Sequence, residues 1–144
     1  MRNFLNFSMI SLVAVVMFLG LPIKTFAHDH TSPIHQSMKQ LGILSKQISS
    51  TVDDANQNQA NAVNVKKMIE LFHVSFDHAT DAVEDLPASE QSIALLEIQN
   101  MITQEIQLAS ELEKAFIAND NSAAKLLLQK MLDLKAEGHD KYKH

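Results

Sequence analysis

The 144-residue chain has no cysteine, no tryptophan, only three glycines and only three prolines. Without cysteine it can form neither disulfides nor a bond to a cofactor through a thiol. The scarcity of glycine and proline, together with the lack of β-branched runs beyond the first 27 residues, predicts helices and no strand. Stability must therefore come from helix packing or from a bound cofactor.

The first 27 residues have the pattern of a secretory signal peptide. Arg2 supplies a positive charge, residues 7–21 are almost wholly apolar, and residues 25–27 (Thr-Phe-Ala) resemble a cleavage site. The apolar run is short for a bilayer core, which argues against an uncleaved anchor. We therefore expect export to the periplasm, followed by one folded domain of residues 28–144 that is not attached to the membrane.

Acidic side chains outnumber basic ones in this chain. Arg2 and Lys24 would leave with the signal peptide while all 17 acidic residues would stay, which changes the net charge from −5 to −7. Proteins that bind nucleic acids carry basic patches, so we expect no nucleic-acid partner. The same charge is unfavourable at an anionic membrane surface.

Apolar residues recur at three- and four-residue spacing in four segments. The predicted helices span about 33–55, 62–85, 90–118 and 122–142. Ser32 and Pro33 mark the first helix start, the polar tract 56–61 is a predicted loop, and Pro87 closes the second helix. Short connections favour an all-α, antiparallel up-down-up-down four-helix bundle. A monomer is the first expectation, and a dimer of helical hairpins is the alternative.

Met38 and His139 lie on the apolar stripes of the first and the last predicted helix. In an antiparallel bundle, the start of the first helix lies beside the end of the last. Met38 follows Pro33 by five residues and His139 precedes His144 by five. At 1.5 Å per residue, each is about 7.5 Å from the same end of the bundle. We expect the two side chains to face each other, and a thioether opposite an imidazole can hold a haem iron.

The two ends of the helical region resemble a known family. Met38-Lys-Gln-Leu41 and His139-Asp-Lys141-Tyr142-Lys143 are similar to the ends of cytochrome b562. The resemblance implies a periplasmic electron-transfer protein, not an enzyme, that exchanges electrons with unknown periplasmic redox proteins. Its cofactor would be one non-covalent haem b, with Met38 and His139 as the axial ligands of the iron.

The resemblance also implies further cofactor-binding residues. Lys135 and Lys143 stand where the family usually has arginine beside the haem propionates. Tyr142, three residues after His139 in the sequence, is also among the expected cofactor-binding residues. Gly138 stands where the family has an aromatic residue, which leaves the rim of the pocket less filled. The expected apolar wall from the third helix contains Ile98 and Ile102. Met68, Met101 and Met131 are interpreted as core residues.

A second hypothesis rests on the seven histidines. A haem-free helical protein could bind copper, nickel or zinc as a metal buffer or stress sensor. Cleavage after Ala27 would expose His28-Asp29-His30, whose amine, backbone nitrogens and His30 imidazole suit Cu(II) or Ni(II). The chain has no HExxH run and no glycine-rich phosphate loop, so we do not expect a hydrolase.

Overall fold

A computed structural model describes residues 32–142 of the chain. The expected signal peptide, His28, His30 and Lys143 lie outside the described residues. Within them, none of the helices combines the length and the apolar character that a membrane span requires.

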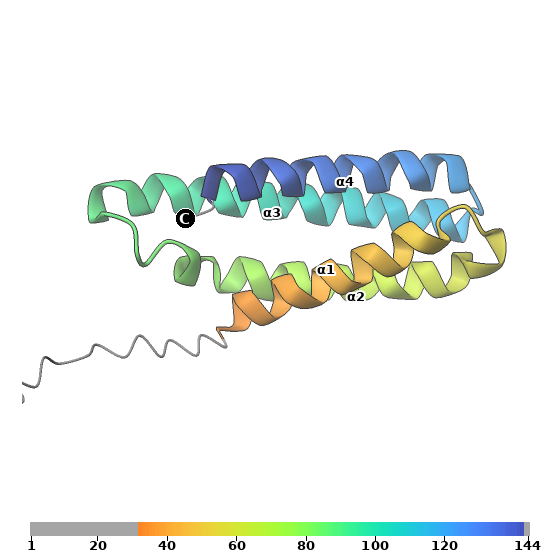
Figure 1. The fold of residues 1–144 in the computed structure, drawn as a ribbon, viewed down its shortest axis with the longest axis horizontal. Coiled ribbons are helices and arrows are strands. Elements are labelled where there is room, and N and C mark those ends of the chain that lie inside the picture. The colour runs from red at the N-terminus through yellow and green to blue at the C-terminus, as the bar shows by residue number, and fades with distance from the viewer. Residues whose placement is uncertain (1–31, 143–144) are drawn as a thin grey trace, which may run out of the picture.

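Four helices make up most of the described residues: α1 (Pro33–Thr51), α2 (Asn58–Asp77), α3 (Ala88–Ile117) and α4 (Asn121–Tyr142). Two short 3₁₀ turns, η1 (Ala55–Gln57) and η2 (Ala79–Ala82), lie in the connections. Residues 32–142 contain no strand. The helices lie lengthwise against one another (Figure 1), which confirms the prediction of an all-α four-helix bundle.

The first helix ends earlier than predicted. α1 stops at Thr51, not near residue 55, and the predicted loop 56–61 is replaced by η1 and the first turn of α2. The Asp54 side chain accepts a hydrogen bond from the Asn56 backbone N–H at 3.0 Å and so caps η1. Short polar side chains that bond to nearby backbone compete with helix geometry, which explains the early stop.

The second helix is also shorter than predicted, because α2 ends at Asp77 and not near residue 85. The chain tightens into η2, which buries Ala79 completely, and the following Val83 is buried as well. A 3₁₀ turn is a common way to leave a helix while its last apolar side chains still reach the core. The last two helices lie within two residues of the predicted bounds.

The core runs along the length of the bundle. Its largest fully buried apolar side chains come from all of the first three helices: Ile48, Val65, Met68, Leu112 and Phe116. Burying each such side chain contributes roughly 1.5–3 kcal/mol. α3 packs against both α2 and α4, and α1 packs against α2.

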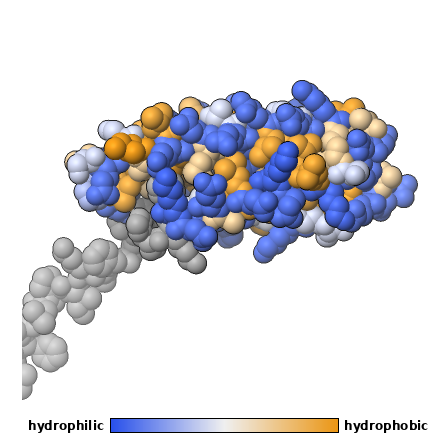
Figure 2. Space-filling model, turned by 90° about the horizontal axis from the view of Figure 1, so that it is seen from above, coloured by the Kyte–Doolittle hydropathy of each residue, from blue (hydrophilic) through white to orange (hydrophobic). Residues whose placement is uncertain are grey.

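Not every apolar residue of the predicted stripes is buried. Ile93 and Leu96 belong to the apolar repeat of the third predicted helix, but both are exposed. The first turns of α3 extend past the described end of α4 (Figure 1), so α4 does not cover them. Figure 2 shows that apolar patches interrupt the hydrophilic surface on one face of the molecule.

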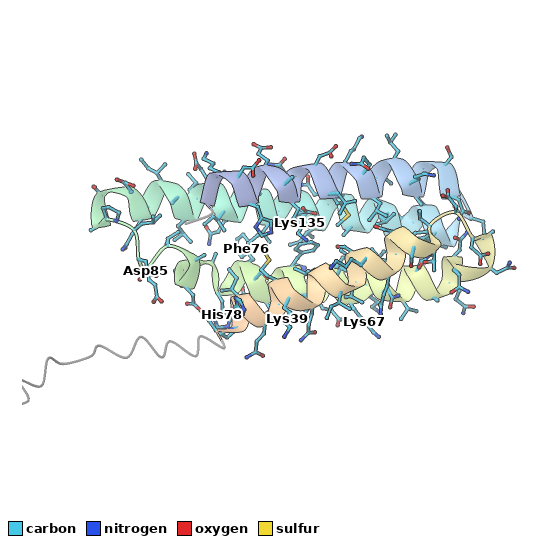
Figure 3. The ribbon with its side chains drawn as sticks, in the orientation of Figure 1. Lys39, Lys67, Phe76, His78, Asp85 and Lys135 are labelled. Carbon is cyan, nitrogen blue, oxygen red and sulfur yellow. The ribbon has the colours of Figure 1, made fainter. Side chains whose placement is uncertain are left out.

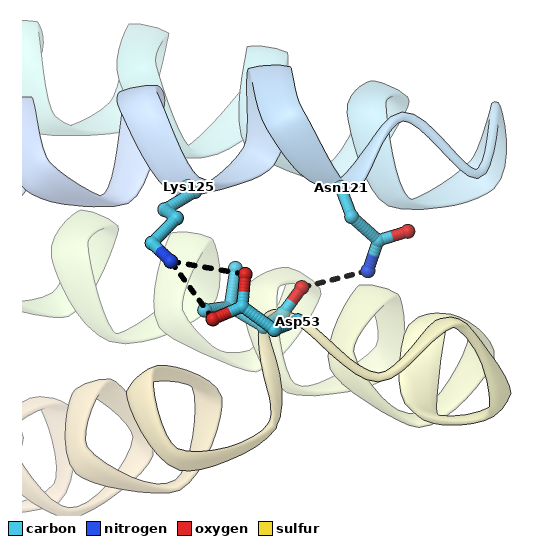
Figure 4. A network of polar contacts seen from close by, with 4 residues as sticks. Asp53, Asn121 and Lys125 are labelled. Carbon is cyan, nitrogen blue, oxygen red and sulfur yellow. Dashed lines mark hydrogen bonds and ion pairs between the residues drawn. The ribbon is translucent and has the colours of Figure 1, made fainter.

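The α1–α2 and α3–α4 connections meet at one end of the bundle, where three asparagines form what we call the asparagine clasp: Asn58, Asn119 and Asn121. The Asn58 amide, only 2% exposed, donates to the side-chain oxygens of Asn119 at 3.1 Å and Asn121 at 2.9 Å. Asn121 in turn donates to the Val52 carbonyl at 2.6 Å (Figure 4). Asn119 has a positive φ of 57°, a conformation that asparagine tolerates after a helix end. The clasp therefore ties the two connections together.

Candidate functional site

A cavity of about 530 Å³ lies toward the other end of the bundle, between α1 and α4. All four helices contribute side chains to its lining. α1 packs on α2 and α4 packs on α3, whereas α1 and α4 make few contacts with each other. The cavity therefore separates the first helix from the last, and its volume is in the range of small-molecule sites.

The lining of the cavity is mainly apolar. It includes both residues that were expected to form the wall from α3, Ile98 and Ile102. All four methionines of the described residues also line it, one from each helix: Met38, Met68, Met101 and Met131. Met68 and Met131 are buried in the core, as their interpretation as core residues requires. The cavity thus offers a flat apolar ligand a soft, polarizable surface.

The structure places both predicted iron ligands on this cavity, Met38 from α1 and His139 from the end of α4. Neither side chain is buried, and Met38 is 46% exposed. A thioether and an imidazole on two different helices thus have access to the same space. Their coordination of an iron stays a prediction.

Lys135 lies one helical turn before His139 and also lines the cavity. Figure 3 shows it projecting from α4 into the space between α4 and the α1–α2 pair. Its Nζ lies 3.9 Å from the position that a Cβ on Gly42 of α1 would take. The ammonium therefore reaches across to α1. Of the other two expected residues on this helix, Tyr142 ends α4 with a side chain that is not described, and Lys143 lies beyond the described residues.

The rim at Gly138 differs from the expectation that it would be poorly filled. A Cβ added to Gly138 would lie 2.6 Å from Cε of Met101 and 4.0 Å from its Sδ. The Met101 side chain from α3 therefore occupies the space beside Gly138. Gly138 directly precedes His139 in the chain. The interpretation of Met101 as a core residue is therefore wrong: it is half-buried, lies outside the core that contains Met68 and Met131, and forms part of the cavity wall.

Glu105 on α3 is the site residue that the sequence interpretation missed. It is only 8% exposed, lines the cavity, and its Oε2 is buried without a hydrogen-bond partner among the described residues. Burial raises the pKa of Glu105 from 4.5 to about 8, although the positive charge of Lys135 opposes this rise. The signal in the sequence was its place on the apolar stripe, four residues after Met101 and seven before Leu112.

The histidines do not form a second centre in the described residues. No group of three or more His, Asp or Glu side chains within residues 32–142 is placed to hold a metal ion. His78 lies 3.8 Å from Asp81, a contact that its spacing on the chain allows. His28 and His30, the residues proposed for Cu(II) or Ni(II), lie outside the described part of the chain.

Comparisons with known proteins do not assign the site. No family model matches the chain, and neither the curated proteins nor the solved structures give a match.

Proposed function

We propose that the protein is a periplasmic electron carrier that holds one non-covalent haem b between α1 and α4. Met38 and His139 would be the axial ligands of its iron. One observation carries the proposal: these two side chains, from opposite ends of the folded region, line the same apolar cavity. A haem needs such a cavity, because most of its ring is apolar while its iron takes one ligand from each face.

The proposed helix arrangement is antiparallel, up-down-up-down. The hydrogen bonds between Asn58 and Asn121 join the start of α2 to the start of α4. The cavity joins residues from the first half of α1 to residues from the second half of α4. Both observations support an alternating direction, which is the order that brings Met38 and His139 to the same height.

The residues present fit a haem in three respects. The cavity is large enough for a small-molecule ligand, and its lining is mainly apolar. The Met38 Sδ and a ring nitrogen of His139 are suitable donors, and the Lys135 ammonium can balance the charge of a propionate. When bound, the haem supplies one-electron chemistry at its iron. With both axial positions filled, the protein would carry electrons and would not act on a small substrate.

The proposed partners are periplasmic proteins that give or accept one electron. After removal of the signal peptide the chain would carry a net charge of −7, because two basic residues leave with it. Surface charge of this sign favours encounters with basic partner surfaces and makes them sensitive to salt. We propose no nucleic-acid partner and no membrane attachment for the exported protein.

The test is a titration of the exported protein with haemin. We expect one haem per chain, a six-coordinate low-spin absorption spectrum, and a Soret band that shifts and sharpens on reduction. The Met38→Leu variant should lose low-spin character, because the sixth ligand is gone. Met68→Leu is the matched control, since it removes a thioether from the buried core side of the cavity. A chain that takes up no haem, or a Met38→Leu spectrum identical to the parent, would contradict the proposal.

A further inference from the structure

Glu105 is not explained by a haem held between Met38 and His139. A buried polar atom without a hydrogen-bond partner costs roughly 1–3 kcal/mol, and such atoms are rare in folded proteins. Glu105 Oε2 is such an atom among the described residues, and a leucine at this position would avoid the cost. A buried carboxyl group that faces a ligand cavity points to a role with the ligand.

Glu105 is the one acidic group among the described residues that line the cavity. The cavity-facing parts of α2 and η2 contribute no titratable side chain, only Met68, Phe72 and Ala82. The other titratable groups come from the two helices that flank the opening and are listed here: His35 and Lys39 on α1, and Lys135 and His139 on α4. No ion pair joins Glu105 to any of them within residues 32–142, although the charge of Lys135 acts on it.

We infer that Glu105 is the proton-accepting group of this site, so that the protein takes up one proton together with each electron. The inference rests on the proposed function, because the charge to which Glu105 would respond is that of the haem iron. The oxidised iron carries one more positive charge than the reduced iron. A positive charge in a cavity of low polarity stabilises the Glu105 carboxylate, and its loss makes the buried carboxylate less favourable than the neutral acid.

The proton and the electron would enter the protein together and leave it together. A one-electron donor protein reduces the iron from the ferric to the ferrous state, and an O–H bond forms on Glu105 with a proton from solvent. Oxidation by the acceptor protein reverses both, so the electron leaves the iron and the proton returns to solvent. The raised pKa of Glu105 supports this role, since a carboxyl with a pKa of about 8 in the protein can change its protonation near neutral pH.

The test is the reduction potential of the haem-loaded protein as a function of pH. Between the pKa values of Glu105 in the oxidised and reduced protein, the reduction equilibrium should fall close to tenfold per pH unit, or about 59 mV. Glu105→Gln, which mimics the protonated acid in shape and charge, should lose this dependence. Glu111→Gln is the matched control, because it removes an exposed carboxylate from the same helix and should keep the dependence.

A second readout measures the proton itself. On reduction in weakly buffered solution with an indicator dye, the parent should take up nearly one proton per electron, and Glu105→Gln should take up almost none. Lys135→Gln should move the pH-dependent range upward, because the Lys135 charge lowers the pKa of Glu105. This variant tests the inference even if Glu105→Gln does not fold.

The failures are distinguishable. A chain that takes up no haem contradicts the proposed function, and the inference with it. A haem-loaded protein whose potential does not change with pH contradicts the inference alone. Equal pH dependence in the parent and in Glu105→Gln also overturns it, since the dependence would then belong to His35 or to the haem propionates.

Discussion

The two ends of the bundle differ in whether their buried polar groups have hydrogen-bond partners. In the asparagine clasp, Asn58 and Asn121 donate to and accept from each other, and Asn121 also reaches the Val52 carbonyl. In the cavity, Glu105 is also buried, but one of its oxygens has no partner among the described residues. The clasp is complete within the protein, whereas the cavity lacks a partner that a ligand could supply.

The two ends of the bundle differ in what their polar groups contribute to stability. A satisfied polar network holds helices in register and contributes to stability. A buried acid without a hydrogen-bond partner lowers stability, and a role with a ligand is one explanation for such a group. We therefore expect variants at the clasp to change the free energy of unfolding with little effect on ligand binding. Variants at the cavity should change ligand properties, and some should stabilise the ligand-free protein.

The largest stability effect is expected from Glu105→Gln in the ligand-free protein. Because the folded state holds the Glu105 proton more tightly than the unfolded chain, its contribution is intact below pH 4.5 and is lost as pH rises toward 8. At pH 7 the loss in the parent is about 3 kcal/mol on the scale of 1.36 kcal/mol per pKa unit. Glu105→Gln cannot ionise at this position, so its unfolding free energy should not show this loss.

Urea unfolding at pH 4 and pH 7 measures this effect, with Glu111→Gln as the control for a lost surface carboxylate. The difference in stability between Glu105→Gln and the parent should grow between the two pH values. If that difference is the same at pH 4 and pH 7, Glu105 is not held as a neutral acid.

The next largest effect is expected on haem affinity and not on the stability of the fold. We expect His139→Ala to weaken haem binding about 100-fold, which corresponds to about 2.7 kcal/mol. The ligand-free protein should unfold at the same urea concentration as the parent, because His139 is exposed. His73→Ala, an exposed histidine of α2 that does not line the cavity, should change neither quantity. Unchanged haem affinity in His139→Ala would remove this residue from the ligand set.

Asn121→Ala should weaken the asparagine clasp and so lower the stability of the fold. It removes the donor to the Val52 carbonyl and one partner of the buried Asn58, so we expect a loss of about 2 kcal/mol in unfolding free energy. Haem affinity should stay within twofold, since the cavity residues are not touched. Asn100→Ala, on an exposed position of α3, is the control. Loss of haem binding without loss of stability would contradict the separation of the two ends.

The smallest effect is expected at the surface of the same end. Lys125 and Asp53 form an ion pair of 2.8 Å (Figure 4), but their side chains are 63% and 73% exposed. Solvent and salt screen such pairs, so Lys125→Ala should change the unfolding free energy by no more than about 0.5 kcal/mol. A larger, salt-sensitive loss would show that the clasp extends to this pair.

Helix spacing was readable from the sequence where apolar residues repeat without interruption. The bounds of α3 and α4 agree with the prediction within two residues, whereas α1 and α2 end early. Both early ends depend on local polar bonds or on the burial of Ala79, which periodicity does not register. The same holds for Met101, whose position above Gly138 depends on a contact between two helices.

The sequence alone determined that the chain is helical, that it forms a bundle, and that a methionine lies near the start of its first helix and a histidine near the end of its last. These properties follow from residue spacing, because a helix has a constant rise and a constant turn. Only the tertiary structure decided that a cavity separates α1 from α4 and that Glu105 faces it with an unpaired oxygen. The polarity around a side chain depends on what other helices bring to it, and no local pattern contains that information.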